Sequence, residues 1–201
     1  MTRRPAQGRR FPHPPNRFAR GPLRRLARAA LALFFAALLF RPAADAAPLA
    51  SSQYQVKAAF LYNFMKFVEW PVDGLSGSGT ICLGILGRDP FDDALDEIKG
   101  KGAKGRKVVV QHFRSIEEVK GCDLLFICAS EKGRLSHILK FAHNSPMLTV
   151  ADHEGFCEAG GMINLLFIKN RVSFEVNVAA ASRARLRIRS QLLKLARNVF
   201  E

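Results

Sequence analysis

The chain has 201 residues, which is enough for one ordinary domain or two very small ones, and a formal net charge of +14. Ten arginines and a single acidic residue lie within residues 1–46, whereas residues 47–201 carry 21 basic and 16 acidic side chains. The body of the protein is therefore only mildly cationic, which disfavours a general nucleic-acid-binding role.

The N-terminal region has the order of a secretory signal peptide. An arginine-rich region ending "LRRLARAA" runs into an apolar stretch from Ala29 to Phe40, and Ala44 and Ala46 then match an A-x-A cleavage site. An uncleaved anchor is the second interpretation, because this stretch is shorter than the roughly 18–20 apolar residues that span a bilayer. A nucleic-acid arm is the third, since it would not need an apolar core. We expect a mature chain that begins near Ala47, outside the cytoplasm.

The first half of the mature chain alternates helical and strand-like patterns. Residues 55–70 are expected to be a helix that ends at Pro71, and residues 81–87 read as a strand buried on both faces. Asp89 before Pro90 is typical of a helix N-terminus and predicts a short helix through Ile98. The apolar side chains that define the first helix are Val56, Ala59, Phe60, Phe64, Phe67 and Val68.

The second half continues the alternation and adds a hairpin. Apolar runs on either side of Lys169-Asn170 predict that hairpin, and the period-two segment "RARLRIR" (183–189) predicts a short extended break between two C-terminal helices. The other expected elements are strands at 108–113, 122–130 and 147–152, a helical turn in 115–121, and helices at 132–144, 178–184 and 191–200.

Strands that alternate with helices indicate βαβ units. The predicted fold class is therefore α/β: a three-layer sandwich with a mainly parallel sheet, helices on both faces and an antiparallel edge hairpin. The predicted domains are a cleaved signal peptide, 1–46, and one α/β domain, 47–201.

Several segments resemble known sites and do not satisfy their rules. "GKGAKGRK" (100–107) has the glycine spacing of a P-loop, but Arg106-Lys107 stand where Lys and Ser/Thr are required, and the segment precedes a strand. "GILGRDP" is followed by Asp92 and Asp93, which would repel a phosphate from a helix N-terminus. The histidines lack metal-binding spacing. We therefore expect no cofactor and no metal.

The stretch "ADHEGFCEAGGMIN" (151–164) gathers reactive residue types around Cys157. A catalytic thiol would need a nearby positive group and a positioned histidine. His153 is four residues away, and on a loop that spacing positions nothing. The glycines favour a tight turn. We predict a structural role for this stretch and no enzymatic activity.

The four cysteines, Cys82, Cys122, Cys128 and Cys157, all lie in the mature region. In an oxidising compartment an even number of cysteines predicts disulfides, with three full pairings open. The basic edge "RARLRIR" has no interleaved aromatic residues, so an anion-binding or partner-facing edge is preferred over a nucleic-acid strip.

Six blocks of the mature chain resemble, in order, the YfiR-like family of periplasmic proteins over roughly residues 55–199. They are "VKAAFLYNFMKFVEWP", "GILGRDPFDDAL", "GRKVVVQHF", "CDLLFICASE", "LTVADHEGFCEAGGMINLLFIKNRVSFEVN" and "LRIRSQLLKLAR". The resemblance implies a non-enzymatic regulator that represses an inner-membrane diguanylate cyclase by binding its periplasmic domain. Cyclic di-GMP signalling and biofilm formation would be the output.

The resemblance also implies partners, redox chemistry and site residues. An outer-membrane lipoprotein would relieve repression, and a homodimer is compatible with the family. Cys82 and Cys122 match one redox-sensitive family disulfide. Cys157 matches half of a second, whose other half is here Asn164, which leaves Cys128 as the remaining candidate partner. Arg187 and Arg189 match a small-molecule site. The alternative function is a small-ligand-binding periplasmic sensor for another membrane receptor, such as a histidine kinase.

Overall fold

The structure is a computed structural model that describes residues 46–71, 79–143 and 145–201. The expected signal peptide lies, apart from its last residue, outside these residues. The helices are α2 (Ala46–Phe67), α3 (Leu135–Ala142), α4 (Val178–Arg183) and α5 (Ser190–Leu193), with 3₁₀ helices η1 (Asp92–Leu95), η2 (Ile116–Glu118) and η3 (Ala129–Arg134). The strands are β1 (Val68–Glu69), β2 (Thr80–Leu86), β3 (Gly102–Ala103), β4 (Arg106–Phe113), β5 (Leu124–Ile127), β6 (Leu148–Ala151), β7 (Ile163–Ile168), β8 (Arg171–Asn177), β9 (Arg187–Ile188) and β10 (Asn198–Phe200).

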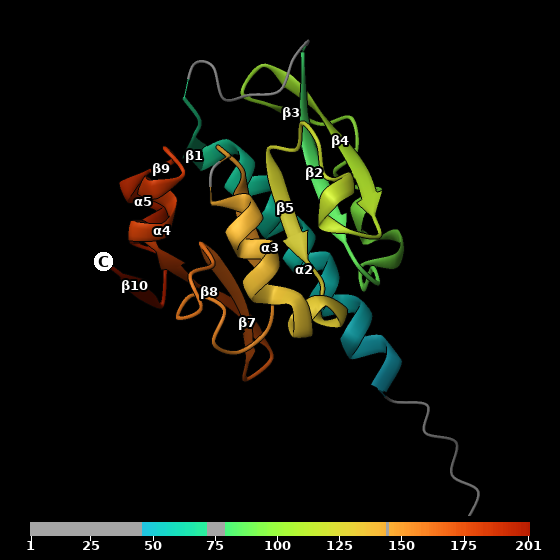
Figure 1. The fold of residues 1–201 in the computed structure, drawn as a ribbon. Helices are drawn as coiled ribbons and strands as arrows, with labels where there is room; N and C mark the ends of the chain where they lie inside the picture. The colour runs from blue at the N-terminus through green and yellow to red at the C-terminus, as the bar shows by residue number, and fades with distance from the viewer. Residues whose placement is uncertain (1–45, 72–78, 144) are drawn as a thin grey trace, which may run out of the picture. The chain divides into compact units, whose positions relative to one another are not determined.

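An eight-stranded sheet in the order β10-β8-β7-β6-β5-β2-β4-β3 forms the middle layer (Figure 1). The strands from β4 through β2, β5 and β6 to β7 run parallel, and the antiparallel pairs are β7 with β8 and β3 with β4. A separate two-stranded ladder joins β1 to β9. The predicted α/β class with a mainly parallel sheet is confirmed.

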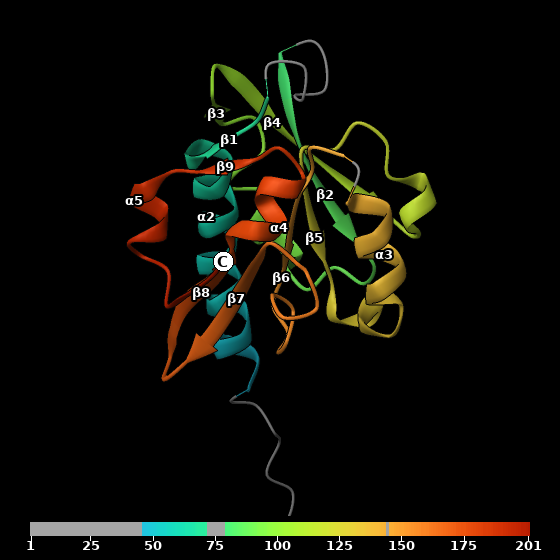
Figure 2. The same ribbon diagram turned by 60° about the vertical axis from the view of Figure 1, so that its left-hand side comes forward.

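Alternating side chains of the buried strands supply two apolar cores, one on each face of the sheet. Leu83 and Phe126 pack with α2 in the larger core, whereas their neighbours Leu125 and Ile127 pack with α3 in the smaller one. Figure 2 shows α2 and α3 on opposite sides of the sheet. Strands buried on both faces read as continuous apolar runs, which explains why the sequence revealed them.

Helix α2 was predicted, but the face that it buries differs from the expected one. Val56 is 45% exposed and Ala59 is also exposed, so neither belongs to the packed face. The buried stripe runs through Ala58, Leu61, Phe64, Met65 and Val68. Lys57 lies in this stripe and is 4% exposed. Because a lysine is not counted as an apolar position, the apolar pattern of the sequence predicted a different buried face.

The predicted hairpin forms, with both turn residues in the left-handed region, at φ 50° for Lys169 and 60° for Asn170. The expected helix over 191–200 is wrong in its second half. Helix α5 ends at Leu193, and β10 then pairs in parallel with β8. Without β10, the outer edge of β8 would have unpaired backbone N–H and C=O groups. Pairing these groups with residues 198–200 outweighs the weak helical propensity of those three residues.

The short helix expected after Asp89 is also only partly present. Asp89 Oδ1 accepts a hydrogen bond from the backbone N–H of Phe91 at 2.7 Å, as a cap should. The chain then forms the 3₁₀ helix η1 and turns instead of an α-helix, and Phe91 and Leu95 enter the larger core.

Candidate functional site

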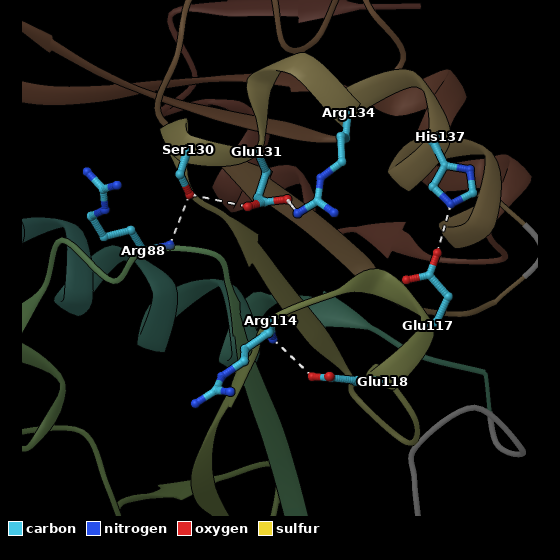
Figure 3. A network of polar contacts seen from close by, with 8 residues as sticks. All are labelled: Arg88, Arg114, Glu117, Glu118, Ser130, Glu131, Arg134 and His137. Atoms are coloured by element: carbon cyan, nitrogen blue, oxygen red, sulfur yellow. Dashed lines mark hydrogen bonds and ion pairs between the residues drawn. The ribbon is translucent and has the colours of Figure 1, made fainter.

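The parallel strands β2 and β5 are neighbours whose connections leave to opposite faces of the sheet. α/β proteins commonly bind ligands at such a point, beyond the carboxyl ends of the strands. Here the space is filled by protein. Gly87 has φ +97°, and a Cβ at this position would collide with Ser130 and Glu131. The backbone N–H of Arg88 donates to Ser130 Oγ at 2.9 Å, and Arg134 binds the Glu131 carboxylate (Figure 3).

Further polar pairs fasten the loops around this point. His137 Nε2 lies 3.0 Å from Glu117 Oε1, and the Arg114 backbone N–H donates to Glu118 at 3.0 Å (Figure 3). The hydrogen bond with His137 lowers the pKa of Glu117 to about 2. These contacts hold the loops in place, and the side chains of Arg88 and Arg114 are exposed.

A buried ion pair that was not predicted connects α2 to the residue after β6. Lys57 Nζ lies 2.7 Å from Asp152 Oδ2, and each side chain is 4% exposed. The Tyr54 hydroxyl donates to the same oxygen at 2.9 Å, and the ammonium lies 4.2 Å from the Tyr54 ring centroid. Burial and the nearby Asp152 raise the pKa of Tyr54 well above its usual value. A lysine inside the apolar stripe of α2 was the available signal.

Cys82 and Cys122 lie side by side, at the start of β2 and just before β5. Their sulfurs are 2.7 Å apart, within reach of a covalent bond, for which the separation is about 2.05 Å. Asp123 holds the two segments together, because its carboxylate accepts the Cys82 N–H at 2.7 Å and its own N–H donates to Cys82 O at 3.1 Å. The hydrogen bond between the thiols lowers the pKa of Cys82 and raises that of Cys122. Both thiols are free in this structure.

Cys128 and Cys157 are buried and free, and their surroundings differ. Cys157 lies beside the backbone of Asn164 on β7, where the family disulfide would place its partner, whereas Cys128 follows β5. Strand β6 separates β5 from β7 in the sheet. A bond between these two cysteines stays a prediction.

The Cys157 thiol lacks the surroundings of a nucleophile. Burial raises its pKa to about 12, so the reactive thiolate is disfavoured. The His153 ring packs against Phe156 at 5.3 Å between centroids. The backbone N–H of Gly161 donates to Phe156 O at 2.9 Å and closes the turn.

Arg187 and Arg189, the expected ligand residues, line one open groove of about 450 Å³ beside the β1–β9 ladder. Arg189 Nε donates to Glu69 Oε1 at 2.9 Å, whereas Arg187 has no such partner among the described residues. The bond from Arg189 lowers the pKa of Glu69, and burial together with Arg189 lowers that of Lys104. The groove is therefore cationic and carries one carboxylate.

An apolar groove of about 150 Å³ lies next to it, with Gln191 in the lining of both. Its walls include Phe60 and Phe174, and Leu195 at its rim is 73% exposed. The two grooves together offer charge at one end and apolar surface at the other.

Within residues 46–71, 79–143 and 145–201, no helix has the length and apolar character needed to cross a membrane. In the same part of the chain, no group of three or more His, Cys, Asp or Glu side chains is arranged to hold a metal ion.

Two solved structures are similar to part of this chain. One is an ABC domain in complex with L-Trp from Streptococcus pneumoniae, at 11% identity and a TM-score of 0.45, covering 63% of this chain and 57% of that one. The other is a conserved domain protein from Vibrio cholerae, at 11% identity and a TM-score of 0.48, covering 73% of this chain and 60% of that one. The chain spans less than two thirds of the length of either.

A family model described as YfiR/HmsC-like matches residues 54–197. The match begins within α2 and ends after α5. It contains the four cysteines, Arg187 and Arg189. It supports a regulatory, non-catalytic role in the periplasm. The chain belongs to the YfiR/HmsC-like family.

Proposed function

We propose that this protein represses an inner-membrane diguanylate cyclase by binding its periplasmic domain, and so limits cyclic di-GMP and biofilm formation. The match to the YfiR/HmsC-like family over residues 54–197 carries this proposal. An outer-membrane lipoprotein that sequesters the repressor would end repression.

An exposed apolar rim at the β10 end of the sheet suits a protein partner. Phe167 is 40% exposed, Val199 is 43% exposed and Leu195 is 73% exposed. Phe167 and Val199 lie on the α2 side of the sheet. Val199 pairs with Val176, and Phe167 is two residues from Leu165 on the same strand and so shares its face; Val176 and Leu165 both belong to the core that contains α2. Leu195 also lines the apolar groove beside α2, and exposed apolar side chains next to such a groove favour an interface.

Deletion of the gene, with cyclic di-GMP measured in the cells, tests the repression. We expect the level to rise and to return when the wild-type gene is restored. Restoring Leu195→Glu/Val199→Glu should leave it high, because a charge in the rim would be desolvated on binding. Phe141→Glu is the matched control, since Phe141 is 46% exposed on α3, on the opposite face. No rise on deletion would contradict the proposal.

A disulfide between Cys82 and Cys122 is part of the proposal. The 2.7 Å approach of the sulfurs and the oxidising compartment both favour it. It would fix the first strand of the parallel sheet to the segment that opens β5.

A small-ligand sensor for another membrane receptor is the second candidate, favoured by the groove that holds Arg187 and Arg189. An anionic ligand with an apolar body would fit the paired grooves. The test is a thermal-shift screen of small carboxylates and phosphates. A ligand whose stabilisation is lost in Arg187→Ala and kept in Arg171→Ala, an exposed arginine on the hairpin, would favour this function. An unchanged cyclic di-GMP level on deletion would separate it from repression.

A further inference from the structure

Positive charge is concentrated in the C-terminal part of the chain. Residues 169–201 carry eight basic and two acidic side chains, whereas residues 47–168 carry 13 basic and 14 acidic ones. The excess positive charge of the mature chain therefore comes from residues 169–201. Their basic residues are Lys169, Arg171, Arg183, Arg185, Arg187, Arg189, Lys194 and Arg197, and their acidic residues are Glu175 and Glu201.

The fold keeps this charge at one end of the sheet. Residues 169–201 contain β8, α4, β9, α5 and β10, and the strands β10 and β8 lie at the opposite end of the sheet from β4 and β3. Figure 1 shows these C-terminal elements together on one side of the molecule. An end with this charge attracts anionic groups over about 10 Å at 0.1 M salt.

Two of the cations flank the most exposed side chain of the apolar rim. Lys194 and Arg197 lie on either side of Leu195 in the turn from α5 to β10, and both are exposed. Neither side chain has a hydrogen-bonding or ion-pair partner within the described part of the chain. Their charges are therefore available to a docking protein.

Backbone hydrogen bonds fix the turn that carries these two cations. The Lys194 N–H donates to Ser190 O at 3.0 Å, and the Arg197 N–H donates to Phe174 O on β8 at 2.8 Å. The backbone on either side of Leu195 is therefore ordered before a partner arrives. Such order reduces the conformational entropy that binding has to remove.

Acidic side chains are scarce on the surfaces next to this turn. Helix α2, whose Phe60 and Asn63 line the apolar groove together with Leu195, contains no acidic residue. Glu175 on β8 is half-buried, and its carboxylate accepts a hydrogen bond from Asn198 Nδ2 at 2.6 Å. An acidic surface would meet little repulsion at this end of the molecule, whereas a basic one would be repelled.

We propose that the partner surface that docks on the apolar rim is acidic around an apolar centre. The inference rests on the proposed function, in which a membrane protein docks there. Leu195 and the groove beside it would bury the apolar centre, and Lys194 and Arg197 would face carboxylates around it. The groove of about 150 Å³ favours a protein over a lipid surface, because a protruding side chain can enter it.

Binding of the purified exported protein to spheroplasts of the deletion strain tests this inference, because spheroplasts expose the periplasmic face of the inner membrane. We expect binding to weaken roughly tenfold between about 0.05 and 0.3 M salt. Lys194→Glu/Arg197→Glu should weaken it by at least about tenfold at the lower salt, since like charges would then face each other. Lys194→Gln/Arg197→Gln should lie between this variant and the wild type, and it tests the charges without reversing them.

The matched control is Lys132→Glu/Lys140→Glu, which changes the net charge by the same amount. Both lysines are exposed, on η3 and α3, away from the rim. This variant should bind as the wild type does. Loss of binding in the control would show that only the overall charge matters, and would contradict a docking surface at the rim.

Two further arms separate a protein partner from anionic lipid. Protease treatment of the spheroplasts should abolish binding, and vesicles of phosphatidylcholine and phosphatidylglycerol should not sediment the protein. Binding that survives the protease, or that these vesicles reproduce, would identify lipid and overturn the inference. It is also overturned if salt does not weaken wild-type binding, or if the Lys194/Arg197 variants bind as the wild type does.

The same strains keep the two proposals apart. If deletion leaves cyclic di-GMP unchanged while spheroplast binding depends on Lys194 and Arg197, repression is wrong and the acidic partner is another membrane protein. If deletion raises cyclic di-GMP and the charge-reversed variant still binds and restores the low level, repression stands and the acidic partner surface is wrong.

Discussion

Replacing Lys57 by Met removes the cation from a pair in which both side chains are 4% exposed and the charged atoms are 2.7 Å apart. Asp152 would then be a buried carboxylate that keeps, among the described residues, only the hydroxyl of Tyr54 as a partner. Breaking a buried ion pair in this way costs about 3–5 kcal/mol. At about 2–4 °C per kcal/mol for a chain of this size, thermal unfolding should move down by about 6–20 °C.

Urea unfolding followed by circular dichroism measures this cost directly. The matched control is Lys99→Met, because the Lys99–Asp96 pair is 50% and 63% exposed, and such pairs contribute at most about 1 kcal/mol. The triple variant Tyr54→Phe/Lys57→Met/Asp152→Leu removes every polar group together and should recover most of the stability. If Lys57→Met costs no more than Lys99→Met, the pair does not hold α2 on the sheet.

Three other predictions follow from contacts around the sheet. Peptide mapping of the unreduced protein should show Cys82 bonded to Cys122, and reduction should cost about 4 kcal/mol for a 40-residue separation; a free Cys82 would contradict this. Gly87→Ala should lower the free energy of unfolding by about 1–3 kcal/mol, because φ is +97° and the new methyl meets Ser130, whereas Gly105→Ala meets no atom within 4 Å and tests the φ contribution alone. Burial raises the pKa of Cys157 from 9.0 to about 12, so the thiol ionises at a lower pH in the unfolded chain than in the folded one. The stability that this thiol contributes below pH 9 should therefore be lost as the pH rises towards 12. Urea midpoints measured across that range should fall less steeply in Cys157→Ala than in the wild type.

The sheet and the hairpin were predictable because they depend on local pattern. Residues 81–86 are apolar throughout, and Lys169-Asn170 supply the left-handed turn that a two-residue hairpin needs. The buried face of α2 was not predictable. Lys57 interrupts its apolar stripe, and the charge of Lys57 is paired with Asp152, which is 95 residues away. Residues 198–200 became a strand only because β8 had an open edge.

The candidate site shows the same division. The sequence singled out Arg187 and Arg189, and the structure brings them into one groove, but Glu69 reaches that groove from 120 residues away. Arg183 and Arg185 belong to the same basic segment, were not singled out, and line a separate groove with His143. The position of that groove depends on where α3 ends, which no spacing within the segment could reveal.

The β1–β9 ladder has a consequence for the order in which the protein folds. It pairs Val68 with Ile188, and α2 contacts β8 and α5 in addition to the earlier η1 and β3, so part of the surface that covers α2 is made last. A chain that emerges N-terminus first must therefore leave part of the apolar stripe of α2 uncovered until about residue 190 is available. Closing a loop of this length before the contacts form makes folding slow. Truncation before β9 should leave part of α2 uncovered and the chain prone to aggregation.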